Sequence, residues 1–231
     1  MERLLKSASS LFRKSGPRLN RQVLIFDLDG TLIDSQRDLA TGINLMRRHY
    51  GLSPLKLDTV TGYVGDGVRN LVARALKDAP FAVDIEEAVA LNKQFYRRHL
   101  HDETVLYPGV REGLAALARA GHGLAVLTNK PEQACRELLA HFRLRRRFGA
   151  VVGGDSGLPL KPDPRAVHAI LERLGGAPGS AWMIGDNHTD IAAARRAGVH
   201  SIFASYGFGA LGMERPELTA AGFDEIADCF L

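Results

Sequence analysis

Short apolar runs alternate with segments of helical periodicity along most of this chain, and that alternation is the feature that most restricts its fold. Five runs are short, rich in Val, Ile and Phe, and followed by a turn or a polar loop: QVLIFD (22–27), HGLAVLTN (122–129), FGAVVGG (148–154), AWMIGD (181–186) and HSIFASYG (200–207). Helical patterns separate the later runs, at 108–121, 131–144, 163–176 and 189–198. Strand and helix in alternation predict a parallel α/β sheet, here a Rossmann-like doubly wound core.

Residues 36–107 interrupt this alternation. The segment contains helical patterns and no strand pattern of comparable strength; the expected helices are 36–50, 66–77 and 84–100, with a short helix or turn near 56–62. We therefore predict a small helical cap domain, inserted after the first strand and covering one end of the sheet. The predicted organisation is a basic N-terminal tail (1–20), a core (21–35 and 108–231) and the cap (36–107).

Polar side chains follow four of the predicted strands. They are Asp27 and Asp29 after the first strand, Thr128 and Asn129 after the second, Lys161 in the long loop after the third, and Asp186 and Asp190 after the fourth. Ligands of open parallel sheets bind outside the carboxyl ends of the strands. We therefore expect these side chains to meet at one edge of the sheet.

The residue types in this set point to phosphoryl transfer. Clustered carboxylates repel one another and need a cation, and an all-oxygen set suits Mg²⁺. Lys161 and Thr128 provide a positive charge and a hydroxyl for an anion. Asp27 and Asp29 have i, i+2 spacing, so on an extended strand end both reach one substrate. One can attack phosphorus and the other can transfer protons, and Gly30 allows the sharp turn that follows.

Four motifs, DLDGTLIDS, LTNK, KPDP and GDNHTD, resemble in order those of the haloacid dehalogenase superfamily, across the whole chain except the tail. The resemblance implies Asp27 as nucleophile and Asp29 as general acid/base. It implies that Thr128 and Lys161 stabilise the phosphoryl group. It also implies that Asp27, Asp186 and the backbone carbonyl of Asp29 hold Mg²⁺, with Asp190 supporting the metal site or orienting Lys161.

Asp29 also separates branches of that superfamily. The hydrolytic dehalogenases lack an acid at this position, because a halide leaving group needs no proton. Within the phosphatase branch, DLDGTLIDSQRDLA followed by GYVGDGVRNLV resembles phosphoglycolate phosphatases. Arg69 of the cap could bind a small carboxylate, beside Thr128, Asn129 and Lys161 as substrate ligands.

The resemblance implies a Mg²⁺-dependent phosphomonoesterase that acts on a small phosphorylated metabolite through an aspartyl-phosphate, with 2-phosphoglycolate as first candidate. One alternative keeps the fold and changes the substrate to pyrophosphate, a nucleotide, a sugar phosphate or a phosphonate. The other is a non-catalytic binding relative.

Charge and composition limit the partners. Residues 1–21 contain six of the 30 basic residues and only one of the 26 acidic residues. The rest of the chain therefore has 24 basic and 25 acidic residues. The high pI of about 9.2 therefore reflects the excess of basic residues in 1–21, and we expect no nucleic-acid partner.

No apolar run approaches the roughly 18 residues of a spanning helix. The two distant cysteines, Cys135 and Cys229, favour a reducing compartment. We expect a cytoplasmic monomer or homodimer; the tail could also be an organellar presequence or a weak membrane-surface helix.

Overall fold

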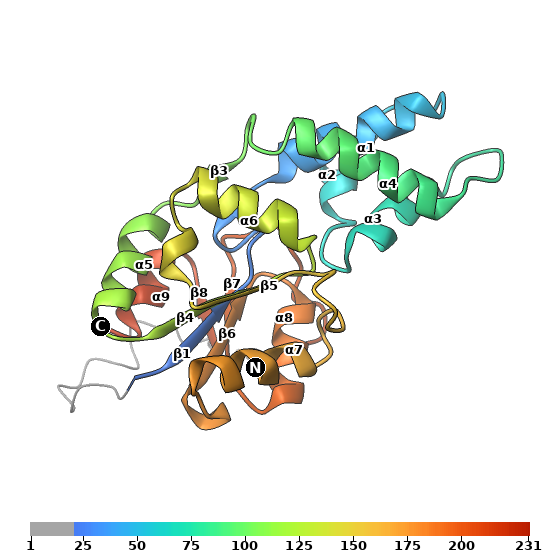
Figure 1. Ribbon diagram of the computed structural model, residues 1–231. Helices are drawn as coiled ribbons and strands as arrows, with labels where there is room; N and C mark the ends of the chain where they lie inside the picture. Colours follow the sequence, from blue (N-terminus) through green and yellow to red (C-terminus); the bar gives the residue numbers. More distant parts are fainter. Residues whose placement is uncertain (1–20) are drawn as a thin grey trace, which may run out of the picture.

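The computed structural model describes residues 21–231, and its centre is a six-stranded parallel sheet (Figure 1). The strand order is β5-β4-β1-β6-β7-β8. The strands are β1 (Val23–Phe26), β4 (Gly123–Leu127), β5 (Ala150–Val152), β6 (Ala181–Gly185), β7 (His200–Ala204) and β8 (Leu218–Ala220). Along the chain, β4 and β5 come first and lie on one side of β1, and β6, β7 and β8 follow and lie on the other side. The carboxyl end of β1, between β4 and β6, is therefore where a doubly wound sheet forms its binding crevice.

Helices cover both faces of this sheet because successive side chains of each strand alternate between them. Leu24 and Phe26 of β1 belong to one apolar cluster, together with residues of α5 (Val110–Arg119), α6 (Glu132–His141) and α9 (Phe223–Asp228). Val23 and Ile25 belong to a second cluster, with residues of α7 (Arg165–Leu174) and α8 (His188–Ala197). Burial on both faces explains why the strands are almost continuously apolar. The predicted α/β fold class is confirmed.

Four helices lie between β1 and residue 105 and form a separate layer at one end of the sheet, at the upper right of Figure 1. We call these helices the cap: α1 (Gln36–His49), α2 (Leu57–Thr61), α3 (Val68–Ala75) and α4 (Ile85–Arg98). They have their own apolar cluster, which includes Ile43, Met46 and Val72. The four helices match the predicted positions to within a few residues.

Two short connections join the cap to the sheet. They pair as an antiparallel two-stranded ribbon of β2 (Ile33–Asp34) and β3 (Val105–Leu106). Asp38, in the first turn of α1, is buried and accepts hydrogen bonds from the backbone N–H groups of Glu103 and Thr104 and from the Thr104 hydroxyl at 2.6–3.1 Å. The entry and exit of the cap are thus tied together.

Some predictions from the sequence concern properties that this structure does not describe. The basic tail (1–20), with its presequence and surface-helix alternatives, lies outside the described residues. The domain boundaries, the oligomeric state and the cytoplasmic location remain predictions. Within residues 21–231, the helices all lack the length and apolar character required to cross a membrane. Cys135 and Cys229 are both buried free thiols.

Candidate active site

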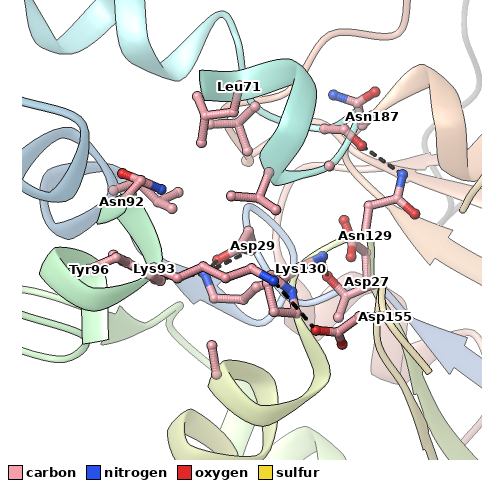
Figure 2. Close-up of a pocket in the computed structure, with 18 of the residues that line it drawn as sticks. Asp27, Asp29, Leu71, Asn92, Lys93, Tyr96, Asn129, Lys130, Asp155 and Asn187 are labelled. Atoms are coloured by element: carbon pink, nitrogen blue, oxygen red, sulfur yellow. Dashed lines mark hydrogen bonds and ion pairs between the residues drawn. The ribbon is translucent and has the colours of Figure 1, made fainter. Parts of the chain in front are cut away.

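Asp27 and Asp29 lie in the tight loop that follows β1. The backbone N–H of Asp27 still donates to the Ile184 carbonyl of β6 at 2.8 Å, so sheet pairing fixes this residue. The loop then turns: Gly30 N–H donates to the Ile33 carbonyl at 2.8 Å, and Gly30 has a φ of +81°. Both aspartates line one cavity, as the i, i+2 spacing predicted (Figure 2).

Three carboxylates converge at this edge of the sheet. Asp27, Asp186 and Asp190 each offer an oxygen within 4.8 Å of the others, and all three are buried. Lys161 reaches into the group, with Nζ 2.8 Å from Asp27 Oδ1 and 2.6 Å from Asp190 Oδ1. The same ammonium donates to the carbonyl of Leu127 at the end of β4. The structure therefore brings these four predicted residues together.

The start of α8 explains how Asp190 meets Lys161. Asn187 is the N-cap of this helix, and its side chain accepts a hydrogen bond from Thr189 N–H. Asp190 completes a capping box, because its Oδ2 accepts from Asn187 N–H at 3.0 Å. The other Asp190 oxygen, Oδ1, accepts a hydrogen bond from Lys161 Nζ. Asp190 is thus held at both oxygens and positions the lysine.

Burial dominates the electrostatics of this cluster. It raises the pKa of Asp27 to about 7, although the Lys161 ammonium acts in the opposite direction. Burial, with the charges of Asp27 and Asp190, also holds the pKa of Asp186 well above its usual range. Burial alone would lower the pKa of Lys161, but Asp190 and Asp27 more than offset it, so that pKa is raised. One lysine does not neutralise three buried carboxylates.

The residues at this site fit a hard divalent cation. Asp27 Oδ1 is buried and, among the described residues, has no partner in hydrogen-bond geometry, although Lys161 lies close to it as an ion pair. Buried carboxylates with excess negative charge and an all-oxygen donor set are what Mg²⁺ takes. Because both Asp190 oxygens already accept hydrogen bonds, Asp27 and Asp186 are the freer donors.

A glycine-rich loop after β7 encloses Asp186, and the sequence analysis did not predict it. Asp186 Oδ2 accepts from the backbone N–H groups of Phe208 and Gly209 at 3.0 and 2.7 Å. A Cβ on Gly207 would lie 2.4 Å from Asp186 Cβ, and one on Gly30 would lie 1.8 Å from Asp186 Oδ2. Glycine is required wherever the backbone approaches this carboxylate so closely.

We expect Gly30→Ala to disrupt the site. The positive φ alone costs about 1–2 kcal/mol of folding free energy, and the new methyl group would displace the Asp186 carboxylate. Gly51→Ala is the matched control, because Gly51 has a φ of +70° with nothing within 4 Å of an added Cβ. Chemical denaturation should show a larger loss of stability for Gly30→Ala, and enzyme assays should show a loss of activity specific to it. Equal effects of the two variants would contradict the close approach.

Asp29 is held by groups that the sequence analysis did not assign. Its Oδ1 accepts from Ser35 Oγ at 2.5 Å, and Lys130 Nζ donates to both carboxylate oxygens at 2.9 and 3.1 Å. Lys130 also donates to the Tyr96 hydroxyl of α4 at 2.6 Å. Ser35 and Lys130 stand within the motifs DLDGTLIDS and LTNK, whereas Tyr96 carries no motif signal.

The remaining predicted substrate ligands fall into different places. Thr128 lines the cavity. Asn129 also lines it, but its amide bonds Gly65 of the cap and the Lys161 backbone, at 2.8–3.0 Å. Its position favours a bridging role between loops over substrate contact.

Arg69 lies outside the cavity lining. It is exposed and pairs with Glu86 on the cap surface at 2.8 Å. This arrangement gives no support to a substrate contact by Arg69. The cap cations that do line the cavity are Lys93 and Arg97 of α4, which pair with Asp155 and Glu137 of the core.

The cavity between cap and sheet is small, about 190 Å³. Its cap side is mostly apolar, with Leu39, Val64 and Leu71, and its core side carries the acids and Lys130. Pockets for drug-sized molecules measure roughly 300–1,000 Å³. The volume therefore suits a compact ligand.

Comparisons with known proteins agree with this geometry. The family described as haloacid dehalogenase-like hydrolase matches residues 24–204, more than half of the chain. The chain belongs to the haloacid dehalogenase-like hydrolases. A phosphoglycolate phosphatase of Chromobacterium violaceum is 38% identical over 211 residues, covering 90% of this chain and 95% of that protein. One of Nitrosospira multiformis is 39% identical over 191 residues, covering 81% and 84%.

Solved structures of this hydrolase family show the same architecture. A crystal structure from Haemophilus somnus 129pt, described as a predicted phosphoglycolate phosphatase, matches with a TM-score of 0.86 at 29% identity and covers 91% of this chain and 98% of that one. The predicted resemblance to the superfamily and to phosphoglycolate phosphatases is thus confirmed.

Proposed function

We propose that this hydrolase is a Mg²⁺-dependent phosphomonoesterase of small phosphorylated metabolites, with 2-phosphoglycolate as its first candidate substrate. The observation that carries the proposal is the cluster of Asp27, Asp186, Asp190 and Lys161 at the carboxyl edge of the sheet. Asp27 and Asp186 of this cluster line a small cavity that the cap covers. The similarity to phosphoglycolate phosphatases supports the same substrate. A volume of about 190 Å³ favours a compact phosphate ester over a nucleotide.

The chain's own residues divide the reaction into two displacements. A carboxylate oxygen of Asp27 attacks phosphorus, the bond from phosphorus to the ester oxygen breaks, and Asp29 gives that oxygen a proton. Asp29 then takes a proton from water, which attacks the phosphorus, and the bond to Asp27 breaks as phosphate leaves. Lys161 and Thr128 stabilise the charge on the phosphoryl oxygens.

Asp27, Asp186 and the backbone carbonyl of Asp29 would hold Mg²⁺, whose charge, when it is bound, offsets that of the phosphoryl oxygens. Asp190 orients Lys161. The cap excludes bulk water from the cavity during the first displacement.

The deciding experiment is phosphate release from a panel of phosphorylated metabolites, with Mg²⁺ and with excess chelator. We expect hydrolysis of 2-phosphoglycolate above the other compounds, loss of activity to background with chelator and recovery on adding Mg²⁺. Chelator-sensitive hydrolysis of another compound would keep the reaction and change the substrate. A chain inactive on the whole panel would favour a binding relative.

Asn92 of α4 is the candidate for selecting the substrate's second polar group. It lines the cavity and is 4% exposed, and its Oδ1 lacks a hydrogen-bond partner among residues 21–231. An unpaired buried acceptor costs about 1–3 kcal/mol, and a ligand hydroxyl that donates to Oδ1 would recover that energy. The carboxylate of 2-phosphoglycolate would instead accept from the side-chain N–H groups of Asn92. Figure 2 shows Asn92 on the cap side, opposite the acids.

We expect Asn92→Leu to lower kcat/KM for 2-phosphoglycolate by about 10- to 100-fold, the value of a hydrogen bond to a charged group. Hydrolysis of ethyl phosphate, which lacks the second polar group, should stay unchanged. The free energy of unfolding should not fall, because an unpaired polar group is removed. Asn70→Leu, on the exposed side of α3, is the control. Equal losses with both substrates would contradict the assignment.

A further inference from the structure

Lys130 is a buried cation whose contacts come from both the core and the cap. Its side chain is 3% exposed, and its ammonium donates to both Asp29 oxygens and to the Tyr96 hydroxyl. The ammonium also lies 4.5 Å from the centre of the Tyr96 ring, close enough for a cation–π contact. Three donors therefore meet three oxygens, and two of those oxygens belong to the proposed proton-transfer group.

These groups come from separate segments of the core and the cap. Asp29 stands in the loop after β1 and Lys130 follows β4, whereas Tyr96 lies on α4 of the cap (Figure 2). Tyr96 is buried at 8% exposure, and α1 fixes its place: a Cβ on Gly42 would come within 3.0 Å of Tyr96 Cβ. The Tyr96 side chain is therefore held in place by packing within the cap.

Ion pairs at the rim hold the cap on the core in this arrangement. Arg97 of α4 contacts Glu137 of α6 at 2.9 Å, and Lys93 approaches Asp155 at 3.8 Å. His188 of the core lies 3.7 Å from Asp66 of the cap segment. These exposed contacts are individually weak and break readily. The bond from Lys130 to Tyr96 is, in contrast, buried, and it exists when the cap is seated.

We propose that Lys130 and Tyr96 are positioning residues that aim Asp29 at the leaving oxygen when the cap is closed over substrate. The inference rests on the proposed function. With the cap seated, Lys130 is fixed between Tyr96 and Asp29, and Ser35 completes the support of the carboxyl group. With the cap lifted, Lys130 loses its Tyr96 contact and Asp29 keeps a looser set of partners. Proton transfer is thereby restricted to the closed, water-excluding state.

The test uses the dependence of the reaction on its leaving group. The alkoxide released from 2-phosphoglycolate needs a proton, whereas the acetate released from acetyl phosphate, a compound of similar size, does not. A variant that misplaces Asp29 should therefore lose more kcat/KM on the first substrate than on the second. A purely structural defect should lower both equally. The parameter kcat/KM is used because it reports the steps up to departure of the leaving group.

We expect Tyr96→Phe to lower kcat/KM for 2-phosphoglycolate about 10-fold and Lys130→Met about 100-fold, against the 10²–10⁴-fold that general acid catalysis contributes. Losses on acetyl phosphate should be several times smaller. Asp29→Asn is the reference variant, because it shows how kcat/KM for each substrate changes when the proton donor itself is removed. Tyr50→Phe is the matched control, because Tyr50 is a cap tyrosine whose hydroxyl, within the described chain, has no hydrogen-bond partner.

Each other outcome rejects the inference. Equal losses on the two substrates, or no loss, would reject the positioning role. Lys130→Met should lower the unfolding temperature in either case, because it leaves buried Asp29 without its cation, so the comparison of the two substrates decides. If Asp29→Asn itself lacked leaving-group dependence, Asp29 would not be the proton donor. If the unaltered protein released phosphate neither from these two compounds nor from any other member of the panel, the proposed function would fail, a result distinct from the others.

Discussion

Phosphate release should fall to the background rate when Asp27 is replaced by Asn, and the fold should remain. The amide has the shape of the carboxylate but cannot form the bond to phosphorus, so the whole nucleophilic step is lost. The change also removes one negative charge from three carboxylate groups that lie within 4.8 Å of each other. Lys161 keeps its bonds to Asp190 and to the Leu127 carbonyl. We therefore expect an unchanged or higher unfolding temperature together with inactivity.

The control for this variant is Asp34→Asn in the same motif. Asp34 accepts from the backbone N–H and the side chain of Gln36 at 3.2 and 3.1 Å, at the start of α1, and does not line the cavity. We expect activity within a few-fold of the unaltered protein. Steady-state assays with 2-phosphoglycolate and Mg²⁺ compare the two. Substantial turnover by Asp27→Asn would remove Asp27 as the nucleophile.

The sequence located those site residues whose position follows from the sheet. Asp27, Lys161 and Asp186 each stand just after a strand or in the loop it leads to, and parallel strands deliver such residues to one edge whatever the helices do. The same reasoning cannot fix contacts that depend on how the cap sits. Tyr96 is one polar residue on a helix of ordinary pattern, and nothing local indicates that its hydroxyl meets Lys130. The sequence could not predict that Arg69 lies on the outer surface of the cap for the same reason, because this position depends on how the cap helices pack.

Short elements near the chain's end also escaped the sequence patterns. β8 has three residues, too few for an alternation to stand out, and α9 has six. The glycine-rich loop between β7 and β8 looked like a turn after a strand. Its function of enclosing Asp186 depends on a non-local approach, which Gly207 and Gly209 permit and local sequence does not encode.

Lys161→Met should produce the largest loss of stability of any variant considered. The Lys161 side chain is 1% exposed and is the cation between Asp27 and Asp190. Methionine fills the same space but leaves buried carboxylates without their partner. Removing one member of a buried ion pair costs about 3–5 kcal/mol, because the remaining charge is left uncompensated. Chemical denaturation in the absence of Mg²⁺ measures this loss.

The matched control is Lys93→Met, since Lys93 is half-exposed and 3.8 Å from Asp155. An exposed pair contributes about 0–1 kcal/mol, so this variant should unfold almost as the unaltered protein does. The comparison separates removal of a lysine from removal of a buried counter-charge. A double variant, Lys161→Met with Asp190→Asn, should recover part of the stability without recovering activity, because it removes one unpaired carboxylate and restores no cation beside Asp27. If Lys161→Met were as stable as Lys93→Met, the carboxylates would be neutralised by protonation, and Lys161 would serve the phosphoryl group alone.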